Sequence, residues 1–334
     1  MRALTVVFVV NSVLMAEGAD WPQVQRDPQR SGYTDDVASP PYKSAWSISF
    51  GTERIARCTS AIIAEGKVLV GTKQGVMHAV QLADGKELWS YKAGGPILHS
   101  AAAAAGKVFF ACLDGKVYAL DAASGKEAWV FDSGFGFSNA PLVAEGSLFV
   151  GNRKGKFFRL DMADGRTVWE TSLGAPVFQT PAYNDGRVYI GSEDMFMHAL
   201  SAKDGQQVWK SQKLQGQTFK DYWPVVHKGY VIVRPMVGMM DVRVMGFGPL
   251  QWTADPAFVE EATQAYPQGK PLPESIRKAQ DDLVQWFTEN PSYMETYFLK
   301  ESDGNLGFVS PLVRICALGG PVPPPREATT GGIP

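Results

Sequence analysis

Four tryptophans recur at a constant spacing of 40 residues, at Trp89, Trp129, Trp169 and Trp209. Each closes the same phrase, and the four copies read AVQLADGKELW, ALDAASGKEAW, RLDMADGRTVW and ALSAKDGQQVW. A fixed period in the 40s is typical of stacked or radial repeats, in which each repeat is one supersecondary unit. This repeat constrains the fold more than any other feature of the sequence.

Each repeat contains several short predicted strands. Stretches of β-branched and aromatic residues bounded by glycine lie upstream of the phrase, at 66–71, 106–111, 146–151 and 186–191, and this composition is typical of buried strands. A strand such as Lys116–Asp121 then leads into a turn whose glycine supplies a positive φ, at Gly85, Gly125, Gly165 and Gly205. With the Trp strand and an inner strand such as 139–144, the repeat has four antiparallel strands and no helix. That arrangement is one propeller blade.

The phrase resembles the tryptophan docking motif of pyrroloquinoline-quinone-like (PQQ-like) propeller repeats, over roughly residues 20–253 and 296–334. The resemblance implies an all-β propeller of four-stranded antiparallel blades. It also implies two functions, because this superfamily includes quinoprotein alcohol dehydrogenases and the propeller subunit of the outer-membrane protein assembly machinery. A flat indole on the outer strand can bury its body against the neighbouring blade, so we expect the tryptophans to dock blades together.

The docking frame extends in both directions. Trp46 lies 43 residues before Trp89, within a predicted strand at 42–50 that has no partner strands before it. In the superfamily such a strand completes the last blade as a clasp. Downstream, Phe308 takes the Trp place in the phrase at 298–308, which closes a fifth blade whose first strands are predicted at 222–226 and 229–234. The predicted docking residues are Trp46, Trp89, Trp129, Trp169, Trp209 and Phe308.

Blade five contains an insertion, and the repeat stops soon after it. Asp255-Pro256 predicts a helix start, and a second helix is expected at about 274–289, so residues 254–295 form a small helical insertion. Residues 310–317 resemble the inner strand of a sixth blade, and the rest is rich in Gly and Pro. We therefore expect a C-terminally truncated, incomplete ring with about five visible blades. A genuine five- or six-blade propeller is the alternative.

The N-terminus predicts export. Residues 1–19 read as a signal peptide, with Arg2, an apolar core at 3–15 and the small-residue pattern Ala16-Glu-Gly18. No cysteine lies at the cleavage site, so we expect no lipid anchor and a periplasmic or secreted protein. The remaining predicted divisions are 20–253 for the clasp strand and the blades through part of blade five, 254–295 for the insertion, and 296–334 for the rest of blade five with the start of blade six. The net charge of −2 argues against nucleic acid as a partner.

One register of the predicted inner strands is polar in every blade: Thr59, His99, Asn139, Gln179 and Tyr222. Inner strands line the central channel, and hydrogen-bonding groups at a concave mouth are where small ligands usually bind. A solvated channel lined by ordinary polar groups is the alternative. His78 and His198, by contrast, occupy a blade position that is aromatic in other repeats, so we interpret them as packing residues.

Blade five departs most from the pattern. Asp221, Tyr222 and Trp223 replace the residues of the earlier blades, and Arg234 stands where they have Gly or Ala. Asp221 and Arg234 could form an ion pair or a ligand clamp. The candidate channel-mouth residues are thus Thr59, His99, Asn139, Gln179, Asp221, Tyr222, Trp223 and Arg234.

The sequence leaves two classes of function open. The first is a scaffold that binds a small ligand or a protein at the propeller face, without a cofactor. The second, implied by the resemblance, is a dehydrogenase that oxidises an alcohol or a sugar with PQQ and calcium. The adjacent-cysteine pair of the alcohol-oxidising members is absent, and Asp221 is the nearest carboxylate to the polar register. Calcium prefers six to eight oxygen ligands, so we predict no tight binding of PQQ by these blades.

Overall fold

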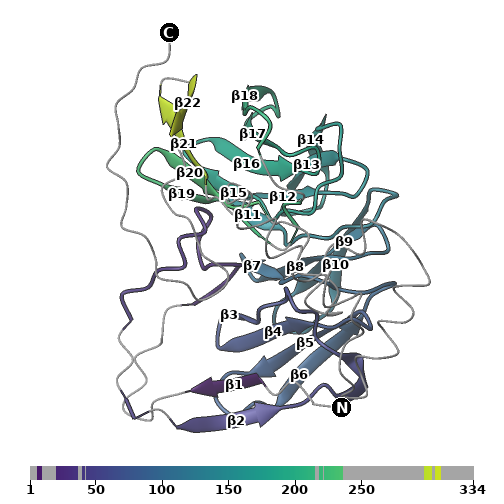
Figure 1. The fold of residues 1–334 in the computed structure, drawn as a ribbon. Helices are drawn as coiled ribbons and strands as arrows, with labels where there is room; N and C mark the ends of the chain where they lie inside the picture. Colours follow the sequence, from purple (N-terminus) through teal and green to yellow (C-terminus); the bar gives the residue numbers. More distant parts are fainter. Residues whose placement is uncertain are drawn as a thin grey trace, which may run out of the picture.

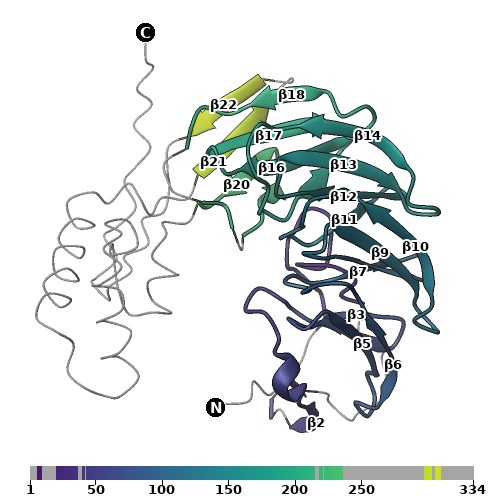
Figure 2. The same ribbon diagram turned by 90° about the vertical axis from the view of Figure 1, so that its right-hand side faces the viewer.

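The computed structural model describes residues 20–36, 40–41, 43–214, 218–220 and 222–235, and the backbone of three strands at 6–9, 297–302 and 305–309. Within these residues, five four-stranded antiparallel sheets follow one another along the chain, each with its strands in sequence order. Figure 2 shows them fanned side by side in an arc that does not close. The predicted all-β propeller with an incomplete ring of four-stranded blades is confirmed.

Blades one to three have the same strand lengths, and all five blades have the same order of strands (Figure 1). Blade one contains β3 (Ile62–Ala64), β4 (Lys67–Gly71), β5 (Val76–Gln81) and β6 (Glu87–Lys92). Blade two contains β7 (Ala102–Ala104), β8 (Lys107–Ala111), β9 (Lys116–Asp121) and β10 (Glu127–Asp132). Blade three contains β11 (Leu142–Ala144), β12 (Ser147–Gly151), β13 (Lys156–Asp161) and β14 (Thr167–Ser172). Blade four contains β15 (Ala182–Asn184), β16 (Arg187–Ser192), β17 (Phe196–Ser201) and β18 (Gln207–Lys210).

Blade five and the clasp complete the described fold. Blade five contains β19 (Val225–His227), β20 (Tyr230–Val233), β21 (Tyr297–Ser302) and β22 (Asn305–Val309). β20 pairs with β21 although a long segment separates the two strands in the sequence. The predicted helices at 254–295 and the predicted sixth-blade strand at 310–317 lie outside the described residues. The clasp strand β2 (Ser44–Ile48) pairs antiparallel with β1 (Val6–Val9), which falls inside the predicted signal peptide.

The first strands form the hub of the arc. β3, β7, β11, β15 and β19 have three residues each, and those of neighbouring blades contact one another. The fourth strands lie at the outer side of the arc (Figure 2). Buried side chains of the second and third strands, such as Phe110, Ile190 and Phe157, fill the space between the sheets. The apolar core is therefore divided among the blade interfaces.

Four outer tryptophans, Trp46, Trp89, Trp129 and Trp169, contact the phrase of the following blade. The indole N–H of Trp89 donates to the Ala122 carbonyl at 3.1 Å, and a Cβ added to Gly125 would lie 2.6 Å from the same ring. Trp46, Trp129 and Trp169 make the equivalent bonds to Leu82, Met162 and Ala202, over Gly85, Gly165 and Gly205. The turn glycines thus serve two purposes, a positive φ and a flat surface for an indole. Trp209 is 7% exposed, and the Phe308 side chain lies outside the described residues.

Candidate functional site

The predicted channel-mouth register lies just before the inner strands, so its placement on those strands is wrong. Asn139 precedes Leu142, the first residue of β11, by three positions, and the offset is the same in the other blades. The inner strands are short because only three residues of each pair with the second strand, as Leu142–Ala144 pair with Ser147–Phe149. The residues ahead of them make other hydrogen bonds.

Two members of the register are buried and bind the protein's own backbone. The Asn139 amide, 1% exposed, donates to the carbonyls of Gly151 at 2.8 Å and Val177 at 3.1 Å. The Gln179 side chain is fully buried, and its Oε1 accepts the Gly191 N–H at 2.6 Å. Asn139 Oδ1 and Gln179 Nε2 have no hydrogen-bond partner. These two amides hold the residues ahead of their inner strands against the end of the second strand of the same blade. One polar atom of each amide remains able to bond another group.

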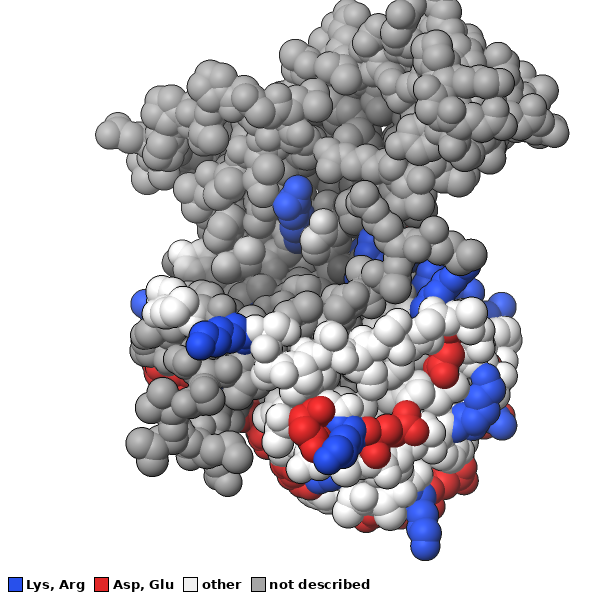
Figure 3. All heavy atoms as spheres, turned by 90° about the horizontal axis from the view of Figure 1, so that it is seen from below, with Lys and Arg blue, Asp and Glu red and all other residues white. Residues whose placement is uncertain are grey.

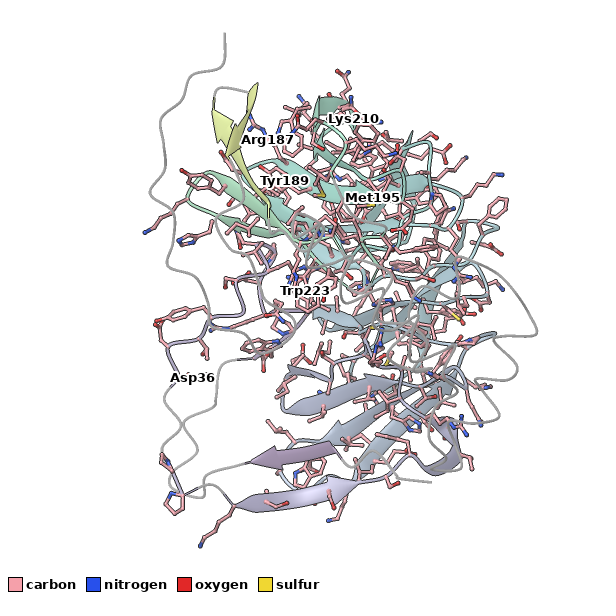
Figure 4. All side chains as sticks on the ribbon, viewed as in Figure 1. Asp36, Arg187, Tyr189, Met195, Lys210 and Trp223 are labelled. Carbon is pink, nitrogen blue, oxygen red and sulfur yellow. The ribbon has the colours of Figure 1, made fainter. Side chains whose placement is uncertain are left out.

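The other candidate residues have different surroundings. His99 is buried, Thr59 has an unpartnered Oγ1, and the Tyr222 carbonyl accepts a hydrogen bond from Thr180. Trp223, labelled in Figure 4, and Arg234 are both partly exposed in blade five. Asp221 lies outside the described residues, so its pairing with Arg234 stays a prediction.

The hydroxyl residues that follow this register connect neighbouring blades. The Ser60 N–H donates to Ser100 Oγ at 2.8 Å, joining blade one to blade two. The Ala140 N–H donates to Thr180 Oγ1 at 3.1 Å, and the Thr180 N–H donates to the Tyr222 carbonyl at 3.1 Å. Thr180 is 3% exposed. These buried bonds give the register a structural role on the inner side of the arc.

The inner edges of all five blades are covered by an N-terminal segment, Asp20–Arg30, which we call the strap. It hydrogen-bonds the middle residue of each inner strand in blade order. Trp21 pairs with Ile63 in both directions at 2.8 and 3.0 Å. The other contacted amides are those of Ala103, Val143, Tyr183 and Val226, which donate to the Pro22 carbonyl, Gln23 Oε1, the Pro28 carbonyl and the Gln29 carbonyl.

One fully buried side chain joins the two halves of the strap to blade four. Arg30 Nε donates to the Pro181 carbonyl at 2.9 Å, and Nη1 donates to the Val24 carbonyl at 2.6 Å and to Gln23 Oε1 at 3.3 Å. Its Nη2 has no hydrogen-bond partner. Burial lowers the pKa of Arg30 to about 9, and the carboxylate of Asp27 opposes that shift. The guanidinium is therefore held in the interior by carbonyl and amide oxygens.

The sequence reasoning missed the strap, although it contains a short repeat of its own. Pro22-Gln23 and Pro28-Gln29 are two copies of one dipeptide, and in each copy the proline carbonyl accepts an inner-strand amide. A proline carbonyl can accept such a bond while the residue offers no donor of its own. This dipeptide repeat, ahead of the first blade, was the signal that could have located the segment.

The two histidines interpreted as packing residues also form polar clusters. His78 Nδ1 lies 2.9 Å from Glu87 Oε2, and its Nε2 lies 2.9 Å from Glu53 Oε2. A histidine between two carboxylates can donate to both only when both ring nitrogens carry protons. His198 contacts Ser192 Oγ and Gln207 Oε1, both at 3.0 Å, and burial lowers its pKa. The burial of both rings is as expected, while their polar partners were not anticipated.

The described residues of the register do not fit a calcium and PQQ site. Its groups are hydroxyl, amide and imidazole side chains and include no described carboxylate, and the Asn139 and Gln179 amides bind backbone groups. Calcium is normally held by several oxygens that include carboxylates. Over the described part of the chain, no group of three or more His, Cys, Asp and Glu side chains has metal-binding geometry. In the same residues, no helix has the length and hydropathy of a membrane span.

Sequence comparison identifies the family. A protein-family model described as outer membrane protein assembly factor BamB matches residues 42–135 and 113–236, together more than half of the 334 residues. The chain belongs to this family of PQQ-like propellers. The resemblance stated from the Trp phrase is thereby confirmed. No curated protein matches the chain.

Solved structures of the PQQ-like propeller family resemble the fold at low identity. BamB from Moraxella catarrhalis is 18% identical with a TM-score of 0.46, over 57% of this chain and 61% of that one. A quinohemoprotein alcohol dehydrogenase from Pseudomonas putida is 18% identical with a TM-score of 0.53, over 65% of this chain and 43% of that one. A europium-containing methanol dehydrogenase is 16% identical with a TM-score of 0.54, over 66% and 55%. The aligned part is thus less than two thirds of each of these proteins, and at such identities only the fold is shared.

Proposed function

We propose that this protein is a periplasmic or secreted scaffold that binds a protein partner or a small ligand at the propeller surface. The observation that carries the proposal is the filled inner edge, where the strap hydrogen-bonds all five blades and register amides bind the backbone. The described channel side is thus engaged by the chain itself. The family description supports a role in protein assembly, and residues 1–19 support export.

The outer surface offers places for a partner. Leu88, Val130 and Val168 lie on the outermost strands β6, β10 and β14 and are 46%, 37% and 40% exposed. Figure 3 shows Lys and Arg interspersed with Asp and Glu over the described atoms of one face. A face of mixed charge resembles ordinary protein surfaces more than the basic surface of a nucleic-acid-binding protein.

A PQQ-dependent dehydrogenase is the second candidate, favoured by the dehydrogenase folds among the structural neighbours. Equilibrium titration of the protein with PQQ and Ca²⁺, followed by quinone absorbance and dye-linked alcohol oxidation, separates the two functions. We expect neither stoichiometric uptake nor turnover. Uptake with turnover that is lost in Arg234→Ala or Asp221→Ala would establish the enzyme and overturn the scaffold.

Site-specific photo-crosslinking in the producing cell tests the scaffold directly. A photo-reactive side chain at Val130 or Val168 should give a discrete crosslinked band of the same mass from both positions. The matched control is Lys126, which is exposed in the turn before β10 and outside the apolar positions. Crosslinks that are absent at all three positions, or equal and diffuse at all three, would contradict partner binding on the outer strands.

A further inference from the structure

We propose that the inner edge of the arc is a peptide-binding groove, which this chain fills in cis with its own strap. The ligand class is a peptide with two Pro-Gln pairs, a turn between them, and an arginine directly after the second pair. This proposal concerns a site that the scaffold function does not use, so the two can fail independently.

The backbone pattern is that of a peptide added to strand edges. The middle amides of β3, β7, β11, β15 and β19 point away from their own sheets and donate to consecutive strap residues 21, 22 and 23 and then 28 and 29. Main-chain bonds to exposed strand edges provide affinity in this mode of recognition, and side chains provide selectivity. The repeat gives each blade the same outward-facing edge amide, so one segment that crosses the blades in order can satisfy all five.

Two strap side chains provide the selectivity. Gln23 makes a two-way contact with β11, since its Oε1 accepts the Val143 N–H at 3.1 Å and its Nε2 donates to the Val143 carbonyl at 3.3 Å. Gln23 Oε1 also accepts from Arg30, whose Nε reaches the Pro181 carbonyl ahead of β15. Arg30 has no exposed surface. A buried, oriented guanidinium is a group that only an arginine-bearing peptide supplies.

The strap adopts a conformation that its own sequence does not favour. Gln25, Arg26 and Arg30 have φ values of 56°, 72° and 61°, a region that residues other than glycine rarely adopt. Such backbone persists where the surroundings over-determine it, and it clusters at ligand clamps. The turn lets the segment leave blade three at Gln23 and rejoin blade four at Pro28. We infer that the blades impose this conformation on the strap.

Hydrogen exchange on the full chain tests the anchoring role of Arg30. In Arg30→Gln, the amides of Ile63, Ala103, Val143, Tyr183 and Val226 should exchange at least tenfold faster, most strongly at Val143 and Tyr183. The matched control is Arg26→Gln, because the Arg26 side chain donates to the Tyr33 carbonyl just beyond the strap and, among the described residues, to no blade. Unchanged protection of the five amides, or an equal loss throughout the second strands, would overturn the groove.

Peptide exchange tests the site in trans. Cleavage at a protease site placed after Asp36 breaks the covalent link between the strap and the blades. A fluorescent peptide of residues 20–33 is then added. We expect saturable uptake, at least tenfold weaker for the Arg30→Gln peptide and within threefold for the Arg26→Gln peptide. If the cut chain loses its cooperative melt once its strap is washed out, the wild-type peptide should restore the melt. Failure of both uptake and restoration, or equal binding of the two variant peptides, would overturn the proposal.

Discussion

The outer and inner sides of the arc join the blades in different ways. On the outer side, the described tryptophan contacts between blades join nearest neighbours. Trp129 of β10 packs on Phe109 of its own blade and contacts Gly165 and Met162 of blade three. On the inner side, one strap of eleven residues hydrogen-bonds all five blades. The outer contacts are nearest-neighbour interactions of the kind that make repeat proteins quasi-one-dimensional. The strap is a long-range interaction that couples blades one to five directly.

This difference determines what each side contributes. Loss of one outer contact should weaken a single blade interface and leave distant interfaces intact. Loss of an inner anchor should be detected in several blades at once. The two sides can therefore be distinguished by where a substitution acts, in addition to how much free energy of unfolding it removes.

The largest expected effect is at an outer docking residue. Trp129→Ala should lower the free energy of unfolding by about 3–5 kcal/mol, because a buried indole leaves a cavity between blades two and three. Trp129→Phe, which keeps most of the buried ring but removes the bond to the Met162 carbonyl, should lower it by about 0.5–1.5 kcal/mol. Chemical denaturation gives the magnitudes. Hydrogen exchange should show reduced amide protection in blades two and three. An equal reduction in blade five would contradict contacts that act only between neighbouring blades.

A smaller loss is expected when the surface under that indole is changed. Gly165 and Gly146 have nearly the same φ, 76° and 70°, but a Cβ at Gly165 would lie 2.5 Å from Trp129 Cε3 while a Cβ at Gly146 meets nothing within 4 Å. Gly146→Ala should lower the free energy of unfolding by about 1–2 kcal/mol through backbone strain alone. Gly165→Ala should lower it by about 1–3 kcal/mol more through overpacking. Equal denaturation midpoints for the two variants would argue against docking on the glycine.

The outer side was predictable from the sequence because it repeats. The period of 40 residues placed Trp89 and its equivalents in one register, and the positive φ of the turn glycines followed from the Asp-Gly and Ser-Gly pairs. The strand Lys116–Asp121 has the predicted bounds. The second role of Gly125, as the surface for an indole, was missed because it depends on a neighbouring blade.

The inner side was less predictable because the strap that joins its blades lies outside the 40-residue repeat. The strap occurs once, and its contacts with Val143 and Tyr183 span more than a hundred residues. The polar register was recognised, but its residues were placed on strands that in fact begin three residues later. Periodicity identifies equivalent positions, whereas it does not say whether an amide such as that of Asn139 binds a ligand or the backbone.

The same substitution at two threonines, Thr180 on the inner side and Thr171 on the outer side, compares the stability that a hydroxyl contributes on each side. Thr180 Oγ1 accepts the Ala140 N–H in the buried inner segment, and Thr171 Oγ1 donates to the Gly205 carbonyl at 2.8 Å on the partly exposed outer strand. Thr180→Val should lower the free energy of unfolding by about 1–3 kcal/mol, because it leaves a buried donor unpaired. Thr171→Val should cost less than about 1 kcal/mol, since water can replace the hydroxyl. If denaturant titrations show a larger loss of unfolding free energy for Thr171→Val, the hydroxyl that matters more for stability lies on the outer side.

The smallest expected effect is a pH dependence within blade four, where His198 occupies the slot that Phe158 occupies in blade three. Burial lowers the pKa of His198, an effect reinforced by Lys210, while Gln207 and Asp194 oppose it. The unfolded chain therefore binds more protons than the folded chain between the lowered pKa and the ordinary value of 6.5. By linkage, stability contributed by the neutral ring is present above pH 6.5 and is lost as the pH falls through the folded-state pKa.

His198→Phe should flatten this acid slope and leave Ser192 Oγ bonded to Asp194 at 2.5 Å. The control is His227→Phe, because His227 is exposed at the end of β19. Urea denaturation at pH values between 7.5 and 5 should show the wild type and the His227 variant losing stability in parallel, while the His198 variant loses less. Parallel slopes for all three proteins would show that the blade interior tolerates a charged imidazole. The acid slope would then have to come from groups other than His198.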